Sequence, residues 1–258
     1  MKTDSHVNDI GRSAESRTSV QMYARIAGLL MLISFVAGGF GESYVPSKLI
    51  VMGNAAATAE NFRHLDSLFR LGFASYLVEA VCDVALALIF YVLLKPVSKG
   101  LALLAAFFGL VATTVFVVAE LFYFAPSFIV GGAPYLKTFS SEQLDTLALL
   151  SLKFYWFAGA LSIVFYGLGW VFRGWLILRS GYFPRILGVL MVLGGLAFIA
   201  RTLTLILAPA YTSAYLLLFM MPGGLLFALW LIVRGVNVSK WEAKAAACEA
   251  SKFGSAKN

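Results

Sequence analysis

The sequence has few of the residues with which soluble enzymes carry out their chemistry. Its 258 residues include two cysteines, Cys82 and Cys248, and two histidines, His6 and His64. One cysteine lies in an apolar run and the other in a polar tail, so the pair cannot build a disulfide framework or a metal knot. So few histidines also argue against a two-histidine haem or a polyhistidine metal site. We therefore expect neither a metal nor a cofactor.

Catalytic motifs are missing as well. The chain has no glycine-rich loop ending in Lys-Ser or Lys-Thr, no His-Glu-x-x-His, no Cys-x-x-Cys and no Gly-x-Ser-x-Gly. The glycine run at residues 38–41 lacks the strand-to-helix context of a phosphate loop, and it is more typical of a helix that ends or loosens. The sequence therefore assigns no catalytic residue.

Charge is scarce too. Only 13% of the residues are charged and 60% are hydrophobic, whereas an average soluble domain has about 25% charged residues. A chain of this composition cannot cover its surface with polar groups, so we expect lipid as its solvent. The net charge of +7 comes from cations between and beyond the apolar runs, which indicates membrane topology rather than a nucleic-acid partner.

Six apolar segments are long enough to cross a bilayer, for which about 20 helical residues are needed. We predict an all-α, polytopic bundle with spans at about 24–44, 68–94, 101–124, 149–178, 185–207 and 215–233. Residues 1–22 are predicted to be a disordered lead, residues 23–236 the transmembrane domain, and residues 237–258 a tail. The first apolar run follows a long polar lead, so it is predicted to be a retained span rather than a cleaved signal.

Basic residues predict the orientation. Most of the 20 lysines and arginines lie in the lead, in the tight turns at 95–100 and 179–185, and in the tail. Positive charge stays on the cytoplasmic side, so we predict that both termini are cytoplasmic. In the two long opposite loops, Asn54 is predicted to cap one short helix and a Ser140–Gln143 capping box to begin another.

Several segments together resemble a bacterial family of six-span membrane proteins known only as a domain of unknown function, family four-three-eight-six of that series. The resemblance rests on RIAGLL at 25–30, AAATAEN at 55–61, SLFRLG at 67–72, CDVALAL at 82–88, RSGYFPRILGVL at 179–190 and VRGVNV at 233–238. It implies six spans in the cytoplasmic membrane of a prokaryote. It implies no activity, cofactor or catalytic residue.

The strongest candidate site is a pair of acids within the second span. Glu79 and Asp83 are four residues apart and so share one helix face. They lie roughly 16 and 22 Å from the outer end of the span, on either side of the midplane. A charge there costs on the order of 2.5–3.5 kcal/mol, and two like charges so close together should not both stay ionised. One interpretation is a proton- or cation-binding site, and the other is a pair of packing residues between helices.

Arg201, on the fifth span beside two threonines, is the predicted partner of Glu79. Lys153 is the alternative, although its side chain could instead reach the headgroups. Arg70 does not share the face of Glu79, and we expect it to pair with Glu42. These residues lie towards the outer half, which favours either an outward-opening polar cavity or an ordinary outer interface. The secondary candidates are Glu42, Arg70, Glu120, Tyr123, Lys153 and Tyr155.

Three functions remain open at this point. The preferred hypothesis is the binding or transport of a small molecule or an ion through this polar site. The first alternative is a non-catalytic accessory or assembly protein, in which the buried charges only pack the helices. The second is an intramembrane enzyme acting on a lipid-soluble substrate through its carboxylates. Apart from the lipid bilayer, the sequence specifies no partner, and it is compatible with self-association.

Overall fold

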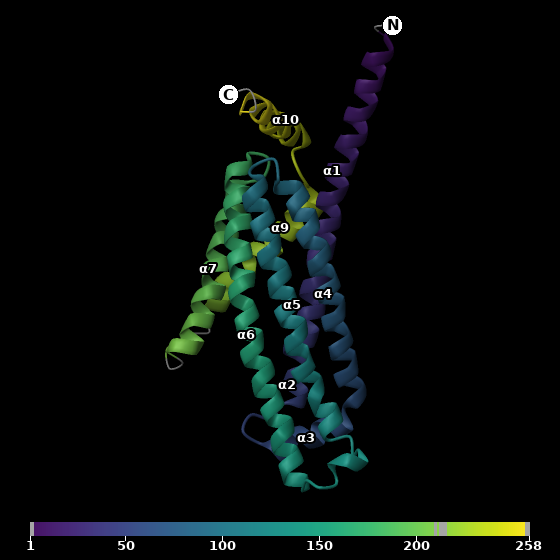
Figure 1. Cartoon of the computed structure of the whole chain (residues 1–258), viewed down its shortest axis with the longest axis vertical. Coiled ribbons are helices and arrows are strands. Elements are labelled where there is room, and N and C mark those ends of the chain that lie inside the picture. The colour runs from purple at the N-terminus through teal and green to yellow at the C-terminus, as the bar shows by residue number, and fades with distance from the viewer. Residues whose placement is uncertain (1–2, 209–210, 212–215, 256–258) are drawn as a thin grey trace. The chain divides into compact units, whose positions relative to one another are not determined.

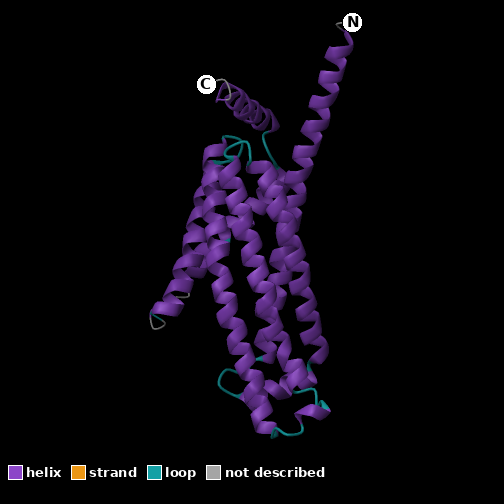
Figure 2. Cartoon of the chain, viewed as in Figure 1, coloured by secondary structure: helices purple, strands orange, loops and turns teal. Residues whose placement is uncertain are grey.

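The computed structural model describes residues 3–208, 211 and 216–255, and no strand occurs among them (Figures 1 and 2). This confirms the all-α class. The elements are α1 (Thr3–Gly38), η1 (Gly39–Tyr44), α2 (Val45–Leu49), α3 (Ala55–His64), α4 (Asp66–Leu94), α5 (Lys99–Ile129), η2 (Pro134–Leu136), α6 (Ser141–Ser180), α7 (Arg185–Leu207), α8 (Leu217–Met220), α9 (Pro222–Val233) and α10 (Val238–Ser255).

Five helical segments are long and apolar enough to cross a membrane. They are Ser19–Leu49, Asp66–Leu94, Lys99–Ile129, Ser141–Ser180 and Arg185–Leu207. A sixth is reached if α9 and the first part of α10, which meet at a bend of 103°, count as one span. These helices identify the chain as a membrane protein.

The predicted sixth span, at 215–233, is not one continuous helix. Its first residue lies outside the described part of the chain, and the rest is divided into α8 and α9 at Met221. Pro222 begins α9. Proline has no backbone N–H to bond to the preceding turn, so it fits the first turn of a new helix better than the interior of a long one.

Two other boundaries differ from the prediction. Helix α1 begins at Thr3, inside the segment predicted to be a disordered lead, because adding a residue to an established helix requires no new nucleation. The Ser140–Gln143 capping box is formed, with the Gln143 N–H bonded to Ser140 Oγ at 3.2 Å, but it begins the 40-residue α6 rather than a separate short helix. The cap at Asn54 is confirmed, since its Oδ1 accepts from the Ala57 N–H at 2.9 Å.

The chain divides into two compact units. The first contains residues up to Leu32, then Ala85–Phe108 and Gly167–Asn258, and the second contains Ile33–Val84 and Gly109–Tyr166. Helices α1, α4, α5 and α6 each contribute residues to both.

In the first unit, glycines bring α6 and α7 into backbone contact. A methyl group on Gly167 would lie 2.7 Å from the Gly195 carbonyl oxygen, and one on Gly174 would lie 2.7 Å from the Gly188 carbonyl oxygen. The reverse distances, from Gly195 and Gly188, are 2.6 and 2.8 Å. The glycines on each helix are seven residues apart, which is two turns, and small residues of this kind allow membrane helices to approach closely. We call these four residues the glycine zipper.

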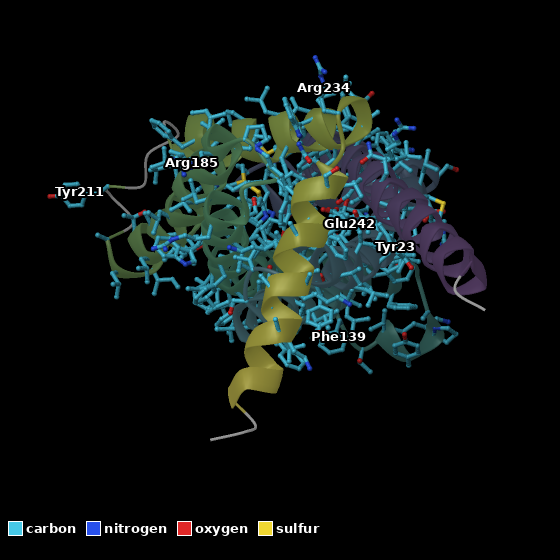
Figure 3. The ribbon with its side chains drawn as sticks, turned by 90° about the horizontal axis from the view of Figure 1, so that it is seen from above. Tyr23, Phe139, Arg185, Tyr211, Arg234 and Glu242 are labelled. Carbon is cyan, nitrogen blue, oxygen red and sulfur yellow. The ribbon has the colours of Figure 1, made fainter. Side chains whose placement is uncertain are left out.

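The end of α4 in the same unit is held by two side chains. The Leu93 carbonyl accepts from the Tyr182 hydroxyl at 2.8 Å and from the Trp241 indole N–H at 2.9 Å. Trp241 belongs to α10, the yellow helix that Figure 3 shows along its length, with Glu242 labelled. These bonds satisfy a carbonyl that the helix end leaves without an internal partner, and they fix α10 within its unit.

A carboxyl and tyrosine cluster in the second unit

The candidate site lies in the second unit, next to a core rich in aromatic side chains. Buried Phe69, Tyr76, Tyr123, Leu152 and Tyr155 from α4, α5 and α6 form its centre. The Tyr123 ring lies 5.4 Å from that of Tyr76 and 5.1 Å from that of Tyr155, measured between centroids. Such packing fixes the hydroxyl groups of three helices close to one another.

Glycines bring the first span close to α4. A methyl group on Gly38 would lie 2.9 Å from both carboxyl oxygens of Glu79, and one on Gly72 would lie 2.9 Å from Val45. The helix then widens into the π-helical η1, Gly39–Tyr44, which carries Glu42. Short π-helical segments within α-helices are frequent at functional sites. The sequence predicts that the glycine run at 38–41 loosens the helix. In the structure this run leaves the space that the Glu79 carboxyl occupies.

The Glu42 and Glu79 side chains approach each other closely enough to interact. Two carboxyl groups can form a hydrogen bond only when one of them carries a proton, because an ionised carboxylate can only accept. Asp83, one turn further along α4, acts electrostatically on both glutamates and accepts from the Ser34 hydroxyl at 3.3 Å. The structure thus joins the predicted Glu79–Asp83 pair to Glu42. Glu42 is exposed, whereas Glu79 and Asp83 are half-buried.

A chain of hydroxyl groups supports η1. The Tyr76 hydroxyl donates to the Gly41 carbonyl at 2.8 Å and lies 3.0 Å from the Tyr155 hydroxyl. Each hydroxyl has a single proton. Since that of Tyr76 goes to Gly41, Tyr155 must be the donor to Tyr76. The chain therefore runs from α6 through α4 to the residue that precedes Glu42.

Glu120 and Tyr123 are on α5, three residues apart and on one face. Glu120 is 4% exposed and Tyr123 is fully buried. Neither carboxyl oxygen of Glu120, nor the Tyr123 hydroxyl, has a hydrogen-bond partner among the described residues. Glu120 acts electrostatically on Glu79 and on the hydroxyls of Tyr76, Tyr123 and Tyr155, and Glu42 acts on Glu120. Two of the secondary candidates thus form a second polar group beside the first.

Arg70 and Lys153 do not join this cluster. Arg70 pairs with Asp66 at 2.7 Å on the exposed surface of α4, so the predicted Glu42–Arg70 pair is wrong; an acid one turn earlier on the same helix is simply nearer. Lys153 is exposed on α6. Arg201 is half-buried on α7 in the first unit, and its pairing with Glu79 stays a prediction.

Within the described residues, Glu42, Glu79 and Glu120 form no ion pair. Among the same described residues, no three histidine, cysteine or acidic side chains are placed so that they could bind one metal ion. A surface pocket of about 440 Å³ lies apart from this cluster, at the start of α6, where Phe139, Glu142 and Leu147 line it.

A charged network joins α3 to the beginning of α6. The Arg63 guanidinium contacts Asp145 at 3.0 Å and Glu60 at 3.3 Å, and the His64 ring lies 2.6 Å from Glu60. The hydrogen bonds from His64 and Arg63 hold the pKa of Glu60 below its usual value. Because Asp145 is only 13% exposed, its ion pair with Arg63 attaches α3 to α6 at a partly buried contact.

Residues 26–235 of the chain match the family model described as a domain of unknown function, DUF4386. It is 26% identical over 160 residues to an uncharacterised protein of Archaeoglobus fulgidus, an alignment that covers 62% of this chain and 81% of that protein. No solved structure matches it. Because the family model spans most of the chain, including every carboxyl group of the cluster, the protein belongs to the DUF4386 family.

Proposed function

We propose that this chain is a proton-binding protein of a prokaryotic cytoplasmic membrane, which couples protonation of Glu42, Glu79 and Asp83 to the binding or transport of a small molecule or ion. The observation that supports this most directly is the close approach of the Glu42 and Glu79 carboxyl groups, with the Glu79 carboxyl packed against Gly38. A carboxyl–carboxylate pair in an apolar span carries one proton, and losing that proton would place two like charges in contact.

The surroundings favour reversible protonation over a fixed structural role. Glu42 lies at the surface of the second unit, on the π-helical segment rather than in the aromatic core. Asp83 continues the row of carboxyl groups one turn along α4, a rise of about 6 Å. A row of acids along a transmembrane helix is typical of proton pathways in membrane pumps and transporters.

The proposed topology has six crossings and two cytoplasmic termini. Helices α8 and α9 together make the sixth crossing, and α10 lies on the cytoplasmic side with the basic turns at 95–100 and 179–185. Cys248 on α10 tests this orientation. In a Cys82→Ala background, a membrane-impermeant maleimide should label Cys248 in inside-out vesicles and leave it unlabelled in right-side-out vesicles. Labelling of right-side-out vesicles would refute the orientation.

Infrared difference spectroscopy tests the proton site directly. Spectra of the purified protein, recorded across the pH range in which it stays folded, should show a carboxylic acid band that changes with pH. The band should be lost in Glu79→Gln and in Glu42→Gln, because each variant removes one member of the pair. Glu142→Gln, an exposed acid outside the cluster, should leave the band unchanged.

The close packing of Glu79 against Gly38 favours one alternative, an accessory or assembly protein in which the carboxyl groups only join helices. That function requires a proton that stays bound. A carboxylic acid band that is present but does not change with pH would therefore reject the proton-coupled function in favour of the accessory one.

A further inference from the structure

Glu120 and Tyr123 form a second polar group, which is separate from the contact between Glu42 and Glu79. We propose that they bind the positively charged head of a small ammonium-type cation, a group that carries both a charge and N–H donors, in exchange for a proton. The inference rests on the proposed function, because it names the ligand class that the bound proton would exchange with.

The tyrosine hydroxyls and the Glu120 carboxyl offer more hydrogen-bond acceptors than donors. The protons of the Tyr76 and Tyr155 hydroxyls are already used, one on the Gly41 carbonyl and one on Tyr76. The only unassigned hydroxyl proton of the three tyrosines is that of Tyr123. Against this one donor stand the two oxygens of Glu120 and the remaining lone pairs of the tyrosine oxygens. A ligand that completes this group must therefore bring donors.

The polar atoms of Glu120 and Tyr123 are also buried. Both Glu120 oxygens and the Tyr123 hydroxyl are inaccessible and have no hydrogen-bond partner in the described chain. Buried polar atoms in native proteins are nearly always paired, because an unpaired one loses its hydrogen bonds to water and gains none in return. Tyr123 is not an acid, so its orphaned hydroxyl is independent of the acidic cluster and points to the same site.

Aromatic rings border these atoms. The rings of Tyr76, Tyr123 and Tyr155 lie within 5.1–6.4 Å of one another, and Phe116 lies 5.8 Å from Tyr76. Aromatic faces attract cations, ammonium groups among them. A carboxylate bordered by tyrosines thus supplies charge, acceptors and ring faces for one ammonium head.

Exchange follows from the use of the same oxygens. A proton on Glu120 removes the negative charge that would hold the cation, so the two ligands exclude each other. The charged and titratable groups that face Glu120 are Glu42 and Glu79 and the hydroxyls of Tyr76, Tyr123 and Tyr155. Binding should therefore strengthen as the pH rises, because protons compete less.

Thermal unfolding of the full-length protein in detergent tests the inference. Ammonium and methylammonium chloride should raise the melting temperature in a concentration-dependent way. Potassium chloride, whose cation has no N–H donors, and tetramethylammonium chloride, which has charge without donors, should not do so at the same ionic strength. Glu120→Gln should abolish the effect and Tyr123→Phe should weaken binding by at least about tenfold, since a hydrogen bond to a charged group is lost. Glu142→Gln should behave as the wild type.

Equal stabilisation by all four salts, or full ammonium stabilisation in Glu120→Gln, would overturn the inference. If Glu120→Gln does not fold, Tyr123→Phe decides alone, and unchanged ammonium binding in it would overturn the inference as well. The outcome is separable from that of the proton site. Ammonium stabilisation without a pH-dependent carboxylic acid band that is lost in Glu79→Gln would retain this site and reject proton coupling at Glu42 and Glu79.

Discussion

Replacing Gly38 by alanine should disturb the carboxyl pair without unfolding the protein. The new methyl group would lie 2.9 Å from each Glu79 carboxyl oxygen, whereas ordinary contacts begin at 3.4 Å. The carboxyl group must therefore move by about 0.5 Å. Because it is the end of a flexible side chain, it can move, and the movement alters its contact with Glu42.

The two effects of this change on stability oppose each other. Alanine gains up to about 1 kcal/mol over glycine within a helix, and displacing a packed group costs about 1–3 kcal/mol. Because the displaced group is mobile, the cost should fall at the low end, so the net change in unfolding free energy should stay within about 1 kcal/mol. The change in the carboxylic acid band should be large by comparison.

Gly39→Ala is the matched control. A methyl group at this neighbouring position would meet no atom within 4 Å. Both variants should be compared by thermal unfolding and by infrared difference spectroscopy. Gly38→Ala should shift or weaken the pH-dependent band, and Gly39→Ala should leave it unchanged. If the two variants give the same spectra, the Glu79 carboxyl does not lie against Gly38 and the site has been placed wrongly.

Three further predictions concern single residues. Tyr76→Phe leaves both hydrogen-bond partners of the lost hydroxyl buried and unpaired, so it should lower the unfolding free energy by about 1–3 kcal/mol in denaturant titration, whereas Tyr44→Phe on the exposed surface should change it little. Gly195→Ala sets a methyl group 2.6 Å from a backbone oxygen and should lower the melting temperature by the equivalent of about 1–3 kcal/mol, while Gly159→Ala, with nothing within 4 Å, should not. The pKa of Glu60 is lowered in the folded chain. Its contribution to stability is therefore present at neutral pH and is lost as the pH falls through the acid range. If acidification lowered the melting temperature of Glu60→Gln as much as that of the wild type, this prediction would be wrong.

The membrane architecture could be predicted because it depends on composition. An uninterrupted apolar run of span length has few alternatives to a helix in lipid, and five such helices are present. The spacing of Glu79 and Asp83 likewise fixes their common face, whatever else surrounds them. Local caps such as Asn54 depend on two or three neighbouring residues, which is why they too were predicted correctly.

The composition of the cluster could not be predicted, because it depends on contacts between helices. Glu42 joins Glu79 only because η1 changes the helical repeat, and hydropathy carries no signal for a π-helical turn. The pairing of Tyr76 with Tyr155 joins residues 79 positions apart in the sequence. The glycine run at 38–41 was the available signal, since glycine before an acid within a span allows another side chain to approach closely.

The glycine zipper limits how the first unit can move. Its contacts recur two turns apart, with backbone against backbone at both levels, so sliding α7 by one residue would bring Leu187 or Val189 to the place of Gly188. Helices α6 and α7 should therefore behave as one rigid lever. Any conformational cycle in this protein would have to displace that lever as a whole.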